Sequence, residues 1–153
     1  SEKRKQILMF KKIKLILCIS LFVNFFNLSL AKENFFAEAI NKFNEKKLED
    51  SKFLFQRNIV FNPKDAKSYI YLAKIFKEQN NDKEKEKNIN TALLLEPTNE
   101  DAMFMLINTE LDKSNYSAVK DLKEDFQKIC KNLCDKIKFI DNSLKDIEPK
   151  NES

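Results

Sequence analysis

The feature that most constrains this chain is a spacing of 34 residues between two prolines, Pro63 and Pro97. Small and apolar residues recur in the same phase between and around them. Each proline disfavours helical geometry at the preceding residue and donates no backbone hydrogen bond, so we expect a helix to end before each one. A period of this length is typical of repeated helix pairs. The sequence therefore predicts an all-α chain built from such pairs.

Polar residues stand where these helices are expected to begin. Asp65 is placed to cap the helix after the first proline, and Thr98 or Asn99 the helix after the second. Within the central pair, Asn81 is followed three residues later by Glu84, which resembles a capping box. These residues predict where each helix starts.

The turns inside the pairs must form without glycine, because the chain contains none. Such turns often need a residue in the left-handed region, which glycine adopts most readily. Asn80 is a suitable substitute because asparagine tolerates that region, whereas Lys46 and Ser114 are poorer ones. We expect the turns at three short polar stretches, residues 45–47, 80–82 and 113–115.

Residues 66–99 carry the strongest repeat pattern, which is spread over both expected helices. Its members are Tyr69, Leu72, Ala73, Phe76, Ile89, Ala92, Leu93, Leu95 and Pro97. This pattern resembles a tetratricopeptide repeat, and weaker copies occupy residues 32–65 and 100–133. The resemblance implies a helix-turn-helix superhelix of about three repeats, followed by a C-terminal helical cap at 134–148 and a flexible tail at 149–153.

The copies depart from the family pattern in several places. In the first, Glu38, Lys42 and Asn58 replace apolar or small residues. In the central one, Lys85 stands where the repeat packs a small residue, so we expect a loose or distorted helix there. The third lacks the closing proline, and its apolar series continues at spacings of three and four, which predicts a continuing amphipathic helix that caps the stack. That series is Leu133, Ile137, Ile140, Leu144 and Ile147.

The first 31 residues have the pattern of a secretory signal peptide. Six basic residues precede the apolar run 15–30, which ends in Ser29-Leu30-Ala31, with small residues where signal peptidase cleaves. The mature chain would begin at Lys32, in a bacterial periplasm, and Met9 is an alternative start. A retained anchor is disfavoured because about 17 residues span only about 26 Å, short of a bilayer core of about 30 Å. We therefore expect no stable membrane insertion after cleavage.

Two other functions of the N-terminal residues are disfavoured. A lipoprotein signal requires a small residue before the modified cysteine, and Leu17 precedes Cys18. Nucleic-acid binding would need a clustered basic face. The formal net charge of +4 belongs to the targeting segment; without its six basic residues and Glu2 the net charge is about −1.

The composition argues against catalysis. With no histidine there is no Ser-His or Cys-His pair and no imidazole metal ligand. With no glycine there is no phosphate-binding loop of the P-loop or dinucleotide type. We expect a non-catalytic protein with no cofactor and no metal site.

Cys130 and Cys134 remain after loss of the signal, and three interpretations stay open. An even number of cysteines in an oxidising compartment suggests a disulfide. Residues four apart on a regular helix hold their β-carbons about 5–6 Å apart, however, and a disulfide needs about 3.5–4.5 Å. A bond would require a broken turn around Asn132 or a partner chain. Free core cysteines are the second interpretation, and metal or redox chemistry the third.

The resemblance also implies a binding surface, because in the family the first helix of each repeat lines a concave groove. Register places ten residues there: Phe36, Asn41, Lys67, Ile70, Tyr71, Lys74, Lys77, Phe104, Met105 and Asn108. Phe43 falls in the same set, and the alternative for it and several others is packing between repeats. The implied function is binding of a peptide or protein. Self-association into a homo-oligomer is the second function, and a thiol-based redox role the third.

Overall fold

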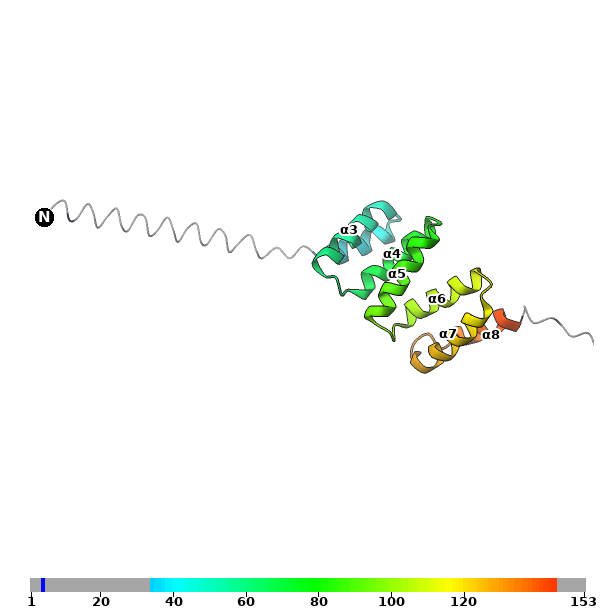
Figure 1. Cartoon of the computed structure of the whole chain (residues 1–153). Coiled ribbons are helices and arrows are strands. Elements are labelled where there is room, and N and C mark those ends of the chain that lie inside the picture. The colour runs from blue at the N-terminus through cyan, green and yellow to red at the C-terminus, as the bar shows by residue number, and fades with distance from the viewer. Residues whose placement is uncertain (1–3, 5–33, 146–153) are drawn as a thin grey trace, which may run out of the picture. The chain divides into compact units, whose positions relative to one another are not determined.

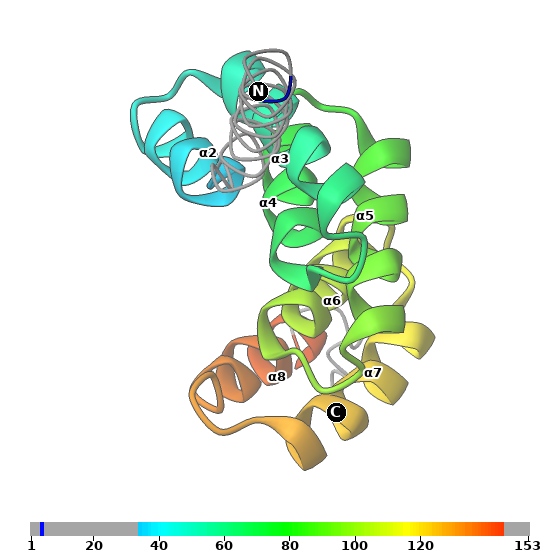
Figure 2. The same ribbon diagram turned by 90° about the vertical axis from the view of Figure 1, so that its left-hand side faces the viewer.

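The structure of the protein is a computed structural model that describes Arg4 and residues 34–145. The remainder of the predicted signal at 1–31, Ile147 and the tail at 149–153 lie outside these residues. Residues 34–145 form helices and no strand, which confirms the all-α class, and the helices belong to one compact unit (Figures 1 and 2). They are α2 (Phe35–Asn44), α3 (Leu48–Phe61), α4 (Ala66–Glu78), α5 (Asp82–Leu95), α6 (Glu100–Asp112), α7 (Tyr116–Ile129) and α8 (Lys136–Lys145). None of the helices in this part of the chain is long and apolar enough to cross a membrane.

The helices are arranged as successive antiparallel pairs. The second helices of the pairs begin at Leu48, Asp82 and Tyr116, each 34 residues after the one before. α2 packs on α3, α4 on α5 and α6 on α7, while α3 contacts α4, α5 contacts α6 and α7 contacts α8. In both views the pairs follow one another in chain order, with α8 beside α6 and α7 (Figures 1 and 2).

The helices end where the prolines predicted. α3 ends at Phe61, two residues before Pro63, and α5 ends at Leu95, two residues before Pro97. Asn99 caps α6 as expected, because its side-chain oxygen accepts the Ala102 N–H at 3.1 Å. The Asn81 side chain likewise accepts the Glu84 N–H at 3.2 Å, which confirms the cap of α5.

The cap expected from Asp65 is wrong. Asp65 precedes α4, but its side chain accepts no backbone N–H of that helix. Its carboxylate accepts instead from Asn58 Nδ2 at 2.8 Å and from Ser68 Oγ at 2.7 Å. Asn58, which interrupts the apolar pattern of the first copy, is only 5% exposed and gives its amide to these partners. A buried polar side chain is stable only when it is hydrogen-bonded, so this network joins α3 to α4.

The three turns inside the pairs share one backbone geometry. Lys46, Asn80 and Ser114 have φ of 61°, 53° and 57°, and they are spaced by 34 residues. After Asn80, the Asn81 N–H donates to the carbonyl of Phe76 at 2.9 Å, and equivalent bonds follow Lys46 and Ser114. This is the Schellman arrangement that ends many helices. The sequence predicted the positions, and the structure puts lysine and serine in a conformation that favours glycine.

Three apolar clusters hold the pairs together. The first joins α2, α3 and α4 through buried residues that include Phe35, Ala39 and Phe55. The second cluster, which is small, joins α4, α5 and α6. The third cluster joins α6, α7 and α8. Burial of a large apolar side chain stabilises by about 1.5–3 kcal/mol. The buried members of the second and third clusters are Ile70, Ala92 and Ala102, then Ile107, Val119, Phe126 and Ile140.

Lys85 does not interrupt its helix, so the expectation of a distorted helix there is wrong. α5 is continuous from Asp82 to Leu95. The Lys85 side chain is buried, and its Nζ reaches the Asp82 carboxylate at 2.7 Å. A lysine stem covers apolar surface while its ammonium group finds a partner near the surface.

Glycine should stabilise two of the three turns. We expect Lys46→Gly and Ser114→Gly each to raise the free energy of unfolding by about 1 kcal/mol, because a side chain with φ near 60° costs about 1–2 kcal/mol. Asn80→Gly should raise the free energy of unfolding by less, since asparagine tolerates the left-handed region. Denaturant unfolding of the full chain measures these differences. Lys47→Gly is the matched control because Lys47 has φ of −82°, and a gain there equal to that of Lys46→Gly would contradict the explanation.

Candidate functional site

An open pocket of about 360 Å³ lies between α2, α4 and the start of α6. α4 supplies the centre, because residues at spacings of three and four share one face of a helix. α2 and the segment around Asn99 supply the two sides. The lining residues are Phe36, Ile40, Lys67, Ile70, Tyr71, Lys74, Asn99 and Asp101.

Aromatic rings support the pocket through Tyr71. Its ring stacks on that of Phe55, with centroids 5.0 Å apart, and meets Phe43 edge-on at 5.3 Å and Phe36 at 6.2 Å. Such offset and edge-to-face pairs are the favoured geometries of aromatic rings. The packing interpretation of Phe43 is therefore supported. Removal of the Tyr71 ring would also disturb the first apolar cluster, so Tyr71 is both a pocket residue and a structural one.

Two lysines give the α4 side of the pocket a positive charge. Lys67 is exposed, and Lys74 holds its Nζ 4.9 Å from the centroid of the Tyr71 ring. Neither forms an ion pair with an acidic side chain in the described part of the chain. Asp101, on the first turn of α6, adds one negative charge from the other side. The pocket therefore combines an apolar floor with two lysines that form no ion pair with another described residue.

Five of the ten residues expected in a groove meet at this pocket: Phe36, Lys67, Ile70, Tyr71 and Lys74. Ile70 is only 4% exposed and belongs to the second apolar cluster, so it lies at the bottom of the pocket. Ile40, Asn99 and Asp101 also line the pocket, although the repeat register does not predict them there. Ile40 follows Phe36 by one helical turn, a spacing that could have identified it.

The other five expected residues lie elsewhere. Lys77, Met105 and Asn108 line a separate cavity of about 30 Å³ beside Lys85. Phe104 packs in the third cluster, with its ring centroid 6.2 Å from that of Phe126. Asn41 is exposed on α2 and lines neither cavity.

The described residues contain neither a cluster of metal-binding side chains nor an unpaired buried polar side-chain atom. Among them no group of three or more cysteine, aspartate or glutamate side chains is arranged to hold a metal ion. Every buried side-chain nitrogen or oxygen in this part of the chain has a hydrogen-bond partner.

Cys130 and Cys134 form a disulfide in the turn between α7 and α8. Their Cα atoms are 5.3 Å apart. α7 ends at Ile129 and Cys130 has an extended backbone, with ψ of 139°. The broken turn that a disulfide required is present, whereas the expected continuing helix is wrong, because α8 starts anew at Lys136.

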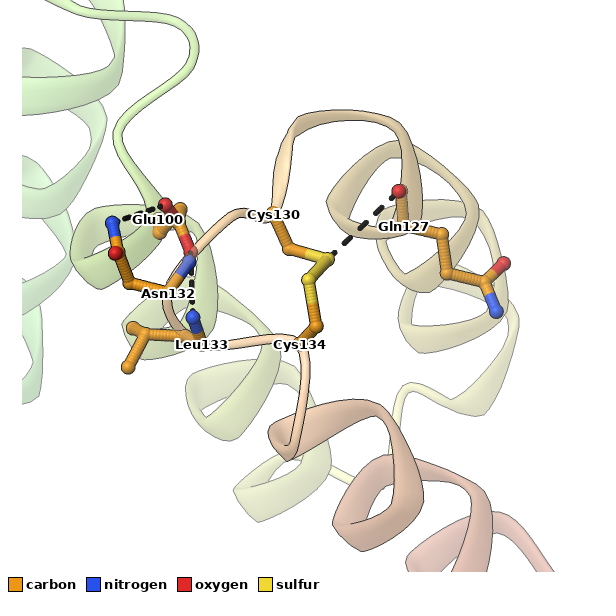
Figure 3. Close-up of a disulfide and its surroundings, with 6 residues drawn as sticks. All are labelled: Glu100, Gln127, Cys130, Asn132, Leu133 and Cys134. Carbon is orange, nitrogen blue, oxygen red and sulfur yellow. Dashed lines mark hydrogen bonds between the residues drawn. A yellow bond between two sulfur atoms is a disulfide. The ribbon is translucent and has the colours of Figure 1, made fainter.

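Glu100 holds the disulfide turn against α6 (Figure 3). Its carboxylate accepts the backbone N–H groups of Asn132 at 2.9 Å and Leu133 at 2.8 Å, and Asn132 Nδ2 at 3.3 Å. Hydrogen bonds from the backbone of Lys131, Leu133 and Asn132 lower the pKa of Glu100 below the ordinary value of a glutamate. No pattern in the sequence indicates this contact, which joins residues more than 30 positions apart.

Comparison with protein-family models and with curated proteins finds no match to this chain.

The contact between Glu100 and the turn should weaken in acid. A lowered pKa in the folded state means that the stabilising contribution is fully present above the ordinary glutamate pKa of about 4.3, and is lost as pH falls through the lower, folded value. We expect the amide proton shifts of Asn132 and Leu133, followed by NMR, to titrate with a midpoint below about 4.3. Glu100→Gln should abolish that step. A midpoint at or above the ordinary value would contradict the assignment.

Proposed function

We propose that this protein is a non-catalytic interaction module of the tetratricopeptide-repeat type that binds a peptide or protein segment in the pocket between α2, α4 and α6. The observation that carries the proposal is the convergence of Phe36, Lys67, Ile70, Tyr71 and Lys74 on one pocket. The 34-residue repeat register of the sequence assigns these five residues to a ligand-facing groove. The 34-residue recurrence of helix starts and left-handed turns supports the repeat type.

The lining of the pocket determines what ligand would fit. A volume of about 360 Å³ lies within the range of pockets that enclose small ligands, roughly 300–1,000 Å³. Phe36, Ile40 and Tyr71 offer apolar surface to one aromatic or aliphatic side chain. Lys67 and Lys74 would attract carboxylates on either side of it. The proposed ligand is an extended segment with one apolar anchor flanked by aspartate or glutamate.

Selection from a displayed random-peptide library on the full chain tests this proposal. We expect enriched peptides to share an apolar residue next to acidic ones. The double variant Lys67→Glu/Lys74→Glu should bind them at least about tenfold more weakly, because it reverses both charges that face the ligand. The double variant breaks no ion pair among the described residues, but it removes the contact of Lys74 with the Tyr71 ring, so its helix content is compared with that of the parent.

Lys83→Glu is the matched control, because Lys83 is exposed on α5 and does not line the pocket. Its affinity for the selected peptides should equal that of the parent. Equal binding by the parent and the double variant would place the ligand elsewhere. Failure to enrich any peptide would argue against the function itself.

A second candidate function, self-association, is favoured by exposed apolar side chains on α3. Phe53, Val60 and Phe61 are 60%, 75% and 64% exposed. Spacings of seven and eight residues place them on one face of α3, and exposed apolar surface on one face often marks a contact with another chain. A mass that rises from monomer to dimer with concentration in light scattering, and that Phe53→Glu/Val60→Glu abolishes, would support this alternative. A monomer at all concentrations would exclude it.

Export to a bacterial periplasm is also part of the proposal, and it depends on residues 1–31. Processing after Ser29-Leu30-Ala31 would give a mature N-terminus at Lys32. N-terminal sequencing of the protein recovered from the periplasmic fraction of its own cells is the measurement. Recovery of the intact chain from the membrane fraction would show that the segment is retained as an anchor.

A further inference from the structure

The sequence and the structure differ in the turn between α7 and α8. Phe126, Ile129, Leu133, Ile137 and Ile140 follow one another at spacings of three or four, which places them on one face of an uninterrupted helix. No proline stands between Ile129 and Lys136, and the chain has no glycine, so this stretch lacks the usual helix breakers. The structure nevertheless interrupts the helix there.

The disulfide cannot form across an uninterrupted helix. Residues four apart on a regular helix keep their β-carbons about 5–6 Å apart, and a disulfide needs about 3.5–4.5 Å. The bond between Cys130 and Cys134 and an uninterrupted helix are therefore mutually exclusive. Before the interruption, the Cys130 N–H donates to the carbonyl of Phe126, four residues earlier, at 2.9 Å, as in an α-helix; after it, the Ile137 N–H donates to the carbonyl of Cys134, three residues earlier, at 3.2 Å, as in a 3-10 turn.

The backbone donors of the turn have acceptors available in both arrangements. In the disulfide-bonded form, the N–H groups of Asn132 and Leu133 are bound by Glu100. In an uninterrupted helix the same groups would donate to the carbonyls four residues earlier, those of Lys128 and Ile129. No buried donor would lose its partner in the change, which removes a common barrier to such a rearrangement.

The position of α8 depends on the interrupted form. Ile140 is fully buried against Ile107 and Phe126, and the Lys123 ammonium pairs with Asp141 at 2.9 Å. The turn folds α8 back against α6 and α7, where the ring of Phe139 meets that of Phe104 with centroids 6.0 Å apart. A straight continuation of α7 would carry α8 away from α6 and uncover this apolar surface.

We propose that Cys130 and Cys134 form a reversible redox switch. With the disulfide formed, α8 lies on the third apolar cluster. With the two thiols reduced, α7 and α8 become one helix and the surface of Ile107 and Phe104 is exposed. This inference does not depend on the proposed function, because no residue of the switch lines the pocket of α2, α4 and α6.

The chemistry of the switch requires a dithiol reductant. Cys134 is exposed, so a thiolate of the reductant reaches its Sγ, forms a mixed disulfide and releases Cys130 as a thiolate. The second thiolate of the reductant then displaces Cys134. Two electrons and two protons pass to the protein, which leaves with two thiols while the reductant leaves as a disulfide. A protein with a dithiol active site, or dithiothreitol in the laboratory, meets this requirement.

NMR of the full chain tests the switch, with Cys18→Ser in every sample so that only two sulfurs react. We expect dithiothreitol to move the backbone chemical shifts of residues 131–135 to helical values and to abolish the contacts between Ile140 and Ile107. Cys130→Ser/Cys134→Ser should show the reduced spectrum under oxidising conditions and should not respond to dithiothreitol.

Two results would overturn the proposal. Retention of the turn shifts and of the Ile140 contacts after reduction would show that the disulfide only reinforces a fixed turn. Loss of helical shifts across 136–145 would show that α8 unfolds instead of joining α7.

A second variant keeps both sulfurs and tests the same equilibrium. Asn132→Ala raises helix propensity in the turn and removes one donor to Glu100. It should shift the thiol–disulfide equilibrium with dithiothreitol toward the thiols by about threefold. Ser143→Ala, a substitution within α8, is the control and should leave that equilibrium unchanged. No difference between the two variants would mean that helix formation is not coupled to reduction.

Discussion

The arrangement of the helix pairs depends on the left-handed residue that reverses the chain after α2, α4 and α6. The bond that follows it, from an N–H to the carbonyl five residues back, sets the direction in which the next helix leaves. This geometry is the same in all three turns. Residues at equivalent positions of α3, α5 and α7 therefore face the first helix of their own pair in the same way. Ser51, Lys85 and Val119 occupy one such position, and all three are buried. Backbone geometry therefore outweighs side-chain type here, which explains why a lysine is accommodated without interrupting α5.

Local signals in the sequence were sufficient for the helix ends and the turns, because prolines, asparagine caps and polar stretches act within a few residues of themselves. The features that the sequence did not predict depend on distant partners. The Asp65 carboxylate bonds to Asn58 and Ser68 instead of capping α4. The apolar spacing after Ile129 is that of a helix, yet the chain forms a disulfide-closed turn there, whose backbone N–H groups bind Glu100 of α6.

The candidate site was predictable in the same partial way. Repeat register places one face of α4 and one residue of α2 at the pocket. The α6 residues that it names lie elsewhere, since Phe104 packs beside α8 and Met105 and Asn108 border a different cavity. Those positions depend on where α8 and the Lys85 side chain lie, which periodicity does not reveal. Asp101 reaches the pocket from the following pair, and a register counted within single repeats does not identify such a neighbour.

One wall of the pocket is formed by α2, the first helix of the stack that the structure describes. α2 supplies Phe36 and Ile40 to the pocket, yet only Phe35 and Ala39 are buried among its residues. An occupant would bind only while α2 is docked, so its apparent affinity is the intrinsic affinity reduced by the undocked fraction. By the same linkage, the occupant would hold α2 in place and slow its local opening. Ligand binding in the pocket and docking of α2 are thus thermodynamically linked, so a change in one changes the other.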